Sequence, residues 1–160
     1  VLTSCGPPKN WLRVVCPTAT LRASMPEIPA DRWFDMDAKF VQVDDEHNGL
    51  PESVAVVHNI LRKAEADGIP SSRIVVGGFS QGAVVALVAG LTYHNPIAGV
   101  CMFSGWFPRV AMNYENHHWD TPILMCHGFN DTRISSEIGE NSAESLRRAG
   151  ASNVDFRLIV

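Results

Sequence analysis

Short, continuously apolar segments alternate along this chain with segments that read as helices, and this alternation limits the fold more than any other feature. The apolar segments lie at residues 11–16, 74–76, 97–103, 123–126 and 154–160. Amphipathic spacing predicts a helix over residues 51–67, a polar helix is predicted over 136–149, and residues 81–91 are apolar on every side. Buried strands separated by helices predict an α/β fold, with a mostly parallel sheet and helices on both faces.

Length and charge restrict the class of protein. The chain has 160 residues, of which 46% are hydrophobic, so we expect a single domain over residues 1–160. A net charge of −4 provides no broad positive field, so no nucleic-acid partner is expected. No apolar stretch approaches the roughly 18 residues of a membrane span. The four cysteines show neither a CxxC pair nor zinc-ligand spacing, which favours buried free thiols in a reducing, cytoplasmic compartment.

The segment Gly78-Phe79-Ser80-Gln81-Gly82 matches GxSxG and stands between an apolar strand and an apolar helix. In that context the serine sits on a sharp strand-to-helix turn, where Cβ atoms on the flanking glycines would clash. The pattern predicts Ser80 as a nucleophile and the backbone N–H of Gln81 as one oxyanion donor. A serine that merely caps the helix is the structural alternative. A dinucleotide-binding GxGxxG would need glycine at Phe79, and a phosphate-binding GxxxxGK would need lysine at Ala83, so both fail.

Asp131 follows the predicted strand at residues 123–126 and a glycine, which makes it the candidate acid of a catalytic triad. Taken alone, a turn aspartate is an equally good interpretation. In this fold the histidine follows the acid, yet every histidine of the chain precedes Asp131. They are His47, His58, His94, His117, His118 and His127. His127 is interpreted as a hydrogen-bonded structural residue, and the pair His117-His118 lacks further ligands at metal spacing, so no metal site is predicted.

These residues make the chain resemble the acyl-protein thioesterases of the lysophospholipase and carboxylesterase family. The resemblance lies in residues 68–82, 16–19 with 33–35, 98–108 and 124–131, in the family's order along nearly the whole chain. It implies an α/β-hydrolase fold, with Ser80 as nucleophile, Asp131 as acid and the Gln81 N–H in the oxyanion hole. It also implies no metal or organic cofactor. The substrates would be acylated proteins, lysophospholipids or small acyl esters, with transient contact at membrane surfaces left open.

Three aromatic residues in the matching segments, Trp33, Trp106 and Phe107, are candidate substrate-binding residues. For the pair Trp33 and Phe34, two interpretations stay open. Either they form a wall that faces the substrate, or they pin a loop to the core, which is the commoner role of large aromatics.

Two parts of the family pattern have no match between Val1 and Val160: the oxyanion loop of His-Gly-Gly type and the catalytic histidine. The chain begins without methionine and stops within an apolar run, so we expect both parts to lie outside it and this segment to be inactive alone. The alternative is a catalytically inactive, hydrolase-like domain that binds acylated partners. A histidine-bearing loop within about a dozen residues after Val160 favours the enzyme, and a stop codon there favours the binding domain.

Overall fold

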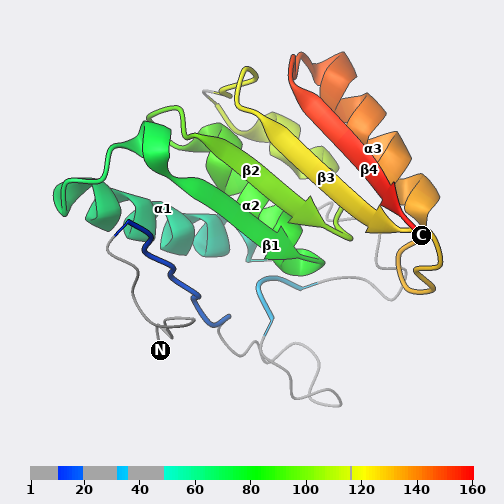
Figure 1. Ribbon diagram of the computed structural model, residues 1–160, viewed down its shortest axis with the longest axis horizontal. Helices are drawn as coiled ribbons and strands as arrows, with labels where there is room; N and C mark the ends of the chain where they lie inside the picture. The colour runs from blue at the N-terminus through cyan, green and yellow to red at the C-terminus, as the bar shows by residue number, and fades with distance from the viewer. Residues whose placement is uncertain (1–10, 20–31, 36–48, 116) are drawn as a thin grey trace.

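The computed structural model describes residues 11–19, 32–35, 49–115 and 117–160. Within them, a parallel sheet runs in the order β1-β2-β3-β4 (Figure 1). Its strands are Val75–Phe79, Gly99–Phe103, Ile123–Gly128 and Val154–Ile159. Because every neighbouring pair is parallel, the carboxyl ends of all the strands meet at one edge. The predicted α/β architecture with a parallel sheet is confirmed.

The helices of the described chain are α1 (Leu50–Ala66), α2 (Gln81–Thr92) and α3 (Ser136–Ala149), with 3-10 turns η1 (Ser71–Arg73) and η2 (Arg109–Asn113). Pro51 lies in the first turn of α1, and Gly150 ends α3 at φ 116°, a left-handed conformation that glycine adopts without a Cβ clash. Residues 83–91 of α2 are all buried, because this helix packs on β1 and β2 with α1 against it. The predicted helices are therefore confirmed.

The core lies between the sheet and the helices. Side chains alternate between the two faces of a strand, so Val100, Met102, Ile123 and Met125 share the face toward the helices. Each of them is only 1–2% exposed. Phe34, which is far away in the sequence, is fully buried in the same cluster.

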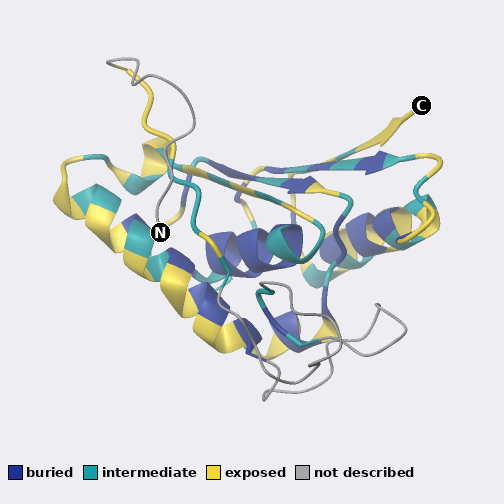
Figure 2. Cartoon of the chain, turned by 90° about the horizontal axis from the view of Figure 1, so that it is seen from below, coloured by how far each residue is buried: buried dark blue, intermediate teal, exposed yellow. Residues whose placement is uncertain are grey.

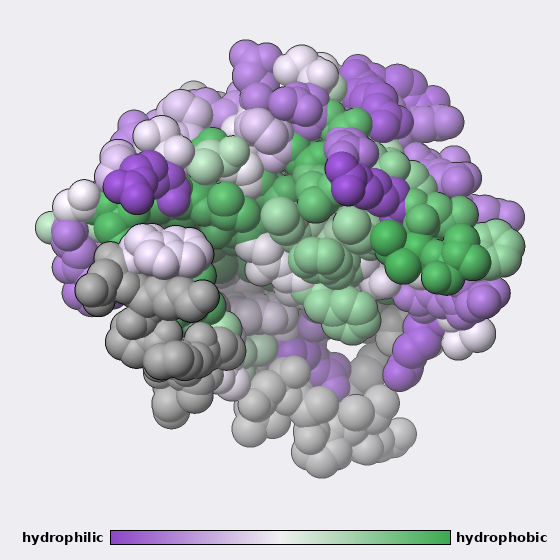
Figure 3. Space-filling view, viewed as in Figure 1, coloured by the Kyte–Doolittle hydropathy of each residue, from purple (hydrophilic) through white to green (hydrophobic). Residues whose placement is uncertain are grey.

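The opposite face of the sheet is open among the described residues. Figure 2 shows the sheet nearly edge-on, with the helices on one side of it. On the other side, Val75, Phe79 and Phe103 are 59%, 68% and 45% exposed, and Figure 3 shows apolar side chains spread over this face. Helices were predicted on both faces, and the described part of the chain covers one.

The first predicted strand is not part of the sheet. Residues 11–16 form isolated bridges at Leu12 and Cys16, without a continuous strand. Trp11 and Leu12 are 71% and 49% exposed. A short apolar run indicates where a strand is able to form, but whether it does so depends on a neighbour that is remote in sequence. The structure therefore corrects the prediction of a buried strand at this position.

The cysteines and helices bear on the expectations about compartment and membrane. Cys16, Cys101 and Cys126 form no disulfide with one another and are half-buried, whereas buried thiols were predicted, and Cys5 lies outside the described residues. Among the helices that the structure describes, none has the length and apolar character to cross a bilayer.

Candidate active site

Ser80 lies at the sharp turn between β1 and α2. Its backbone angles, φ 54° and ψ −121°, fall where non-glycine residues are rare, and such a conformation costs about 1–3 kcal/mol. Backbone bonds hold the turn: the Ser80 N–H donates to Phe103 O at 2.9 Å, and Ser80 O accepts from the Ala83 N–H at 3.0 Å and the Val84 N–H at 3.3 Å. The strand, turn and helix that the GxSxG pattern predicted are confirmed, and the strained residue is the serine itself.

The side chain of Ser80 does not cap α2. Although Ser80 precedes the first helical residue, its hydroxyl makes no capping hydrogen bond. A capping serine has an extended backbone and accepts a bond from an N–H of the first turn. The structure therefore contradicts the interpretation of Ser80 as a helix cap. Ser80 is half-buried at the carboxyl edge of the sheet, where ligands bind in open α/β folds.

The two glycines of the motif, Gly78 and Gly82, differ in whether a side chain would fit at their position. A Cβ on Gly78 would lie 2.1 Å from Gly82 O and 2.7 Å from Ala83 N, and these are backbone atoms that cannot swing away. A Cβ on Gly82 would lie 3.6 Å from Trp33 Nε1, which is ordinary van der Waals contact. The prediction that glycine is needed to avoid a clash is thus confirmed for Gly78 and wrong for Gly82.

This difference predicts unequal effects of the same substitution. Gly78→Ala is expected to destabilise the full-length protein by at least about 2 kcal/mol, because overpacking against a rigid backbone costs about 1–3 kcal/mol or more. Gly82→Ala is the matched control, and it should be neutral or stabilise by up to about 1 kcal/mol, because alanine favours the helix. Urea unfolding followed by circular dichroism measures both. Equal stabilities of the two variants would contradict the clash at Gly78.

Asp131 follows β3 at the same edge of the sheet. Its Oδ1 accepts backbone bonds from the Arg133 N–H at 2.9 Å and the Ile134 N–H at 3.1 Å. The bond from Ile134 is the largest cause that lowers the pKa of Asp131, followed by the bond from Arg133 and, more weakly, by one from the Ser104 hydroxyl. Asp131 is therefore a turn aspartate and also an ionised carboxylate whose other oxygen is able to accept a bond. The two interpretations from sequence are compatible.

Ser104 has no role that the sequence patterns assign. It follows β2 as Ser80 follows β1, and it is the other non-glycine residue with positive φ, 48°, in the described chain. Its N–H donates to Cys126 O at 2.9 Å, and its hydroxyl contributes to the lowered pKa of Asp131. The available signal was a serine placed directly after a strand, and this does not distinguish it from an ordinary loop serine.

Ser80 and Asp131 follow β1 and β3, and β2 lies between these strands. At about 4.8 Å between neighbouring strands, the two strand ends are roughly 10 Å apart. Direct contact is not expected over this distance, whereas an imidazole hydrogen-bonded on both sides would span it. The parallel sheet thus places Ser80 and Asp131 at the same edge, after β1 and β3.

His127, the histidine closest to Asp131 in the sequence, lies in the interior. It is 2% exposed, and its Nε2 is 2.9 Å from Ile134 O and 3.7 Å from Asp131 Oδ2. Helix α3 closes over the ring, since a Cβ on Gly139 would lie 2.5 Å from its Nδ1. The interpretation of His127 as a hydrogen-bonded structural residue is confirmed.

The other described histidines also have partners away from Ser80. His47 lies outside the described residues. The contacts are His58 with Ala89 O, His94 with Glu65, His117 with Ala111 O and Trp119, and His118 with Tyr93 O.

Trp33 and Phe34 lie against the start of α2. The Trp33 N–H donates to Gln81 Oε1 at 3.1 Å, and Gln81 Nε2 donates to Phe34 O at 3.0 Å. Phe34 is fully buried, while Trp33 is half-buried beside Gly82. Phe34 therefore pins the loop to the core, and Trp33 lies beside Gly82 in the first turn of α2. That Trp33 faces a substrate stays a prediction.

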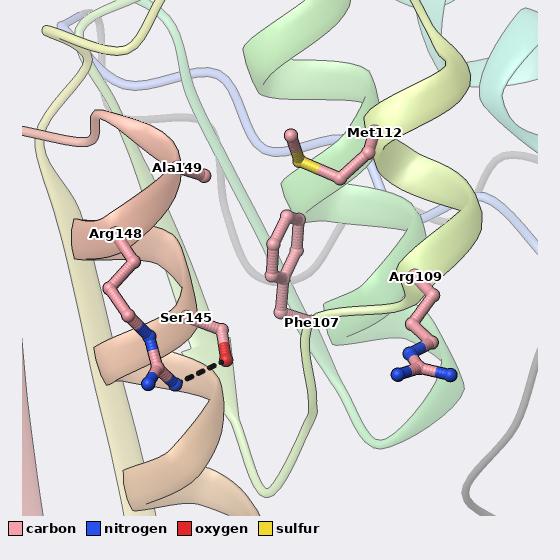
Figure 4. A pocket seen from close by; sticks show the side chains of 6 residues that line it. All are labelled: Phe107, Arg109, Met112, Ser145, Arg148 and Ala149. Carbon is pink, nitrogen blue, oxygen red and sulfur yellow. Dashed lines mark hydrogen bonds between the residues drawn. The ribbon is translucent and has the colours of Figure 1, made fainter.

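The remaining aromatic candidates lie elsewhere. Trp106 is 2% exposed and packs edge-on against Phe34 at 6.3 Å between ring centroids, so it belongs to the core. Its Nε1 has no hydrogen-bond partner among the described residues. Phe107 lines a recess of about 510 Å³ between η2 and α3, together with Arg109, Met112, Ser145, Arg148 and Ala149 (Figure 4). Ser80 does not line this recess, whereas Trp33 lies beside Gly82, two residues after Ser80.

Comparison with known sequences identifies relatives of the chain. Residues 3–159 match the family described as Phospholipase/Carboxylesterase. An acyl-protein thioesterase 1 from Mycosarcoma maydis is 34% identical over 174 residues, covering 95% of this chain and 69% of the relative. One from Cryptococcus neoformans var. neoformans serotype D is 30% identical over 152 residues, covering 91% of this chain and 63% of the relative. The chain thus spans less than two thirds of the Cryptococcus protein.

Solved structures show the same fold. The crystal structure of Arabidopsis thaliana SOBER1 matches with a TM-score of 0.76 at 26% identity, covering 89% of this chain and 70% of that one. The crystal structure of Zea mays acyl-protein thioesterase 2 matches with a TM-score of 0.70 at 29% identity, covering 91% of this chain and 71% of that one. The match over residues 3–159 and the parallel sheet with its serine turn lead to one conclusion: the chain belongs to the phospholipase/carboxylesterase family of α/β-hydrolases.

Proposed function

We propose that the full-length protein is a serine hydrolase that cleaves acyl esters or thioesters through a Ser-Asp-His triad. Ser80 is the nucleophile, Asp131 is the acid, and the Gln81 N–H is one oxyanion donor. The histidine is supplied from outside residues 1–160. The observation that carries the proposal is the strained Ser80 at the β1–α2 turn, with the ionised Asp131 two strands along the same edge.

In the first half of the reaction, the histidine removes the Ser80 Oγ proton while Oγ attacks the acyl carbonyl carbon. The carbonyl oxygen becomes an oxyanion that accepts a bond from the Gln81 N–H, at the positive end of the α2 dipole. When the carbon–sulfur or carbon–oxygen bond breaks, the leaving group takes the proton from the imidazolium. The product of this half is an acyl ester of Ser80 and a free thiol or alcohol.

In the second half, water attacks the acyl ester and the histidine accepts its proton. Collapse of the tetrahedral intermediate returns that proton to Ser80 Oγ and releases a carboxylic acid. Asp131 keeps its negative charge throughout, holding the imidazole in one tautomer and stabilising the imidazolium. The depressed pKa of Asp131 suits this role, because the carboxylate stays ionised at neutral and mildly acidic pH.

The substrate class follows from the relatives and from the wall at the site. Two similar proteins are named acyl-protein thioesterases, which supports an acylated protein cysteine as substrate, with lysophospholipids and small esters as further members of the class. The half-buried Trp33 provides an apolar surface for the acyl group. We place the reaction in the cytoplasm. We also propose transient contact at membrane surfaces, because protein-bound acyl chains insert into membranes.

A labelling experiment tests the proposal. The full-length protein is treated with a fluorophosphonate probe, the labelled peptide is located by mass spectrometry, and hydrolysis of a palmitoyl-cysteine peptide is followed by thiol release. Label on Ser80 together with thiol release supports the enzyme. Binding of the acylated peptide with neither label nor thiol release would instead support the catalytically inactive binding domain.

Residues 1–160 produced alone are expected to show no ester hydrolysis above background. Without a base Ser80 is a poor nucleophile near neutral pH. The oxyanion donor of the His-Gly-Gly-type loop is also expected outside this segment, and losing one such donor raises the activation free energy by about 2.7–4 kcal/mol. The effects of the missing base and the missing donor do not add, because both belong to one catalytic unit. The measurement is p-nitrophenyl ester hydrolysis by the segment beside its Ser80→Ala variant. Turnover that depends on Ser80 would show that a histidine within the segment, such as His127, serves as the base.

A further inference from the structure

The side chain of Gln81 pairs with the backbone of the Trp33-Phe34 segment, which lies far away in the sequence. Gln81 Oε1 accepts from the Trp33 N–H at 3.1 Å, and Gln81 Nε2 donates to Phe34 O at 3.0 Å. One amide group thus satisfies an N–H and a C=O on consecutive residues, as a neighbouring strand would. The segment is held by the residue directly after the nucleophile.

This pairing requires an amide at position 81. Trp33 offers a donor and Phe34 offers an acceptor, so the partner must present one acceptor and one donor side by side. Glutamate would keep the acceptor and place a carboxylate oxygen against Phe34 O, while methionine has similar length and makes neither bond. Buried polar groups left without partners are costly, so either change loosens the segment.

Two more contacts define where the Trp33 ring lies. The Ser53 hydroxyl, from α1, donates to Trp33 O. The Trp33 indole lies over the first turn of α2, since a Cβ on Gly82 would be 3.6 Å from its Nε1. Behind it, the fully buried Phe34 packs edge-on against Trp106. The indole is therefore part of a half-buried residue over the first turn of α2, and polar bonds to its own N–H and C=O hold it there.

We propose that Gln81 is a positioning residue that sets acyl-chain preference, because its side chain fixes Trp33 as the wall against which a long acyl group packs beside Ser80. This inference rests on the proposed hydrolase function. The residue has two separable parts: its backbone N–H faces the oxyanion, and its side chain orients the wall. A side-chain substitution retains the N–H, so it tests the wall without removing the oxyanion donor.

The Trp33 ring affects only those substrates whose acyl chain is long enough to contact it. An acetyl group ends close to the reacting carbon, whereas an octanoyl chain must lie along an apolar surface. Loss of the apolar contact with the acyl chain lowers the discrimination between long and short esters by roughly 10-fold or more. Gln81 thus affects the ratio of kcat/KM for long and short esters, more than it affects turnover of the short ester.

The test compares p-nitrophenyl octanoate with p-nitrophenyl acetate in the full-length protein carrying Gln81→Met. The octanoate to acetate ratio of kcat/KM is expected to fall about 10-fold, with fluorophosphonate labelling of Ser80 retained. Thr92→Val is the matched control. It removes another side-chain bond to backbone in α2, from Thr92 Oγ1 to Val88 O at 2.6 Å, at the far end of the helix. Its ratio should equal that of the wild type.

A double-mutant cycle shows whether Gln81 acts through the wall. Trp33→Ala is expected to lower the ratio by itself, and Gln81→Met should then add little, because both changes remove the same surface. If Gln81→Met does not fold, Trp33→Ala still tests the wall, and an unchanged ratio in that variant contradicts the inference. Equal loss on both esters contradicts it too, since Gln81 would then serve the reaction centre only. Absence of Ser80-dependent hydrolysis in the wild type would instead overturn the proposed function.

Discussion

Replacing Ser80 by alanine in the full-length protein is expected to lower kcat by about 10⁶-fold, the size seen when a triad nucleophile is removed. Without Oγ no acyl ester forms, and the histidine and acid have no nucleophile to activate. Fluorophosphonate labelling should disappear together with hydrolysis. The measurement is kcat on a p-nitrophenyl ester beside labelling of the same preparation.

The fold should survive this change. The Ser80 hydroxyl makes no capping bond, and alanine retains the same Cβ at the same strained φ of 54°. We expect the free energy of unfolding to change by no more than about 0.5 kcal/mol. Loss of activity with unaltered unfolding would therefore be a chemical effect. A variant that is still labelled would show that another residue is the nucleophile.

Asp131→Asn is expected to lower kcat by up to about 10⁴-fold. The asparagine oxygen is still able to accept the bonds from the Arg133 and Ile134 N–H groups, so the turn should persist. Its amide nitrogen, however, presents a donor to the imidazole N–H, which disfavours the catalytic tautomer. The charge that stabilises the imidazolium is lost as well.

The control for this prediction is Asp120→Asn. Asp120 is exposed and accepts one side-chain bond from the Ser152 hydroxyl at 2.9 Å, away from the candidate active site. Its kcat should stay at the wild-type value. Near-normal turnover by Asp131→Asn would assign the acid role to another carboxylate.

The sign of the pH effect follows from the depressed pKa of Asp131. The ionised carboxylate stabilises the native state fully above its unfolded-state pKa, and this contribution is lost as pH falls through the lower native value. Asp131 therefore stays ionised at mildly acidic pH. If kcat falls as the pH is lowered from neutral, we expect the cause to be protonation of the histidine and not of Asp131.

Local patterns were sufficient for much of this protein. The helices α1, α2 and α3 follow from periodicity and boundary residues, because a helix is selected by neighbours in the chain. The apolar runs also indicated the strands at residues 123–128 and 154–159, which found partners in the sheet. The turn at Ser80 belongs to the same class, since a glycine at position 78 is required by atoms only a few residues away. Apolar content alone did not distinguish the bridges at residues 11–16 from a true strand.

Only the tertiary structure decided which side chains lie around the candidate active site. The pairing of Gln81 with Trp33 and Phe34, the effect of Ser104 on the pKa of Asp131, and the burial of His127 under α3 all join residues from separate elements. Such contacts depend on strand order and on how the loops pack, which no pattern within one segment encodes. The sequence by itself determined that a serine would stand at a strained turn between a strand and a helix. Packing of distant segments decided which side chains meet it, because their positions are set by the sheet and the core and not by their chain neighbours.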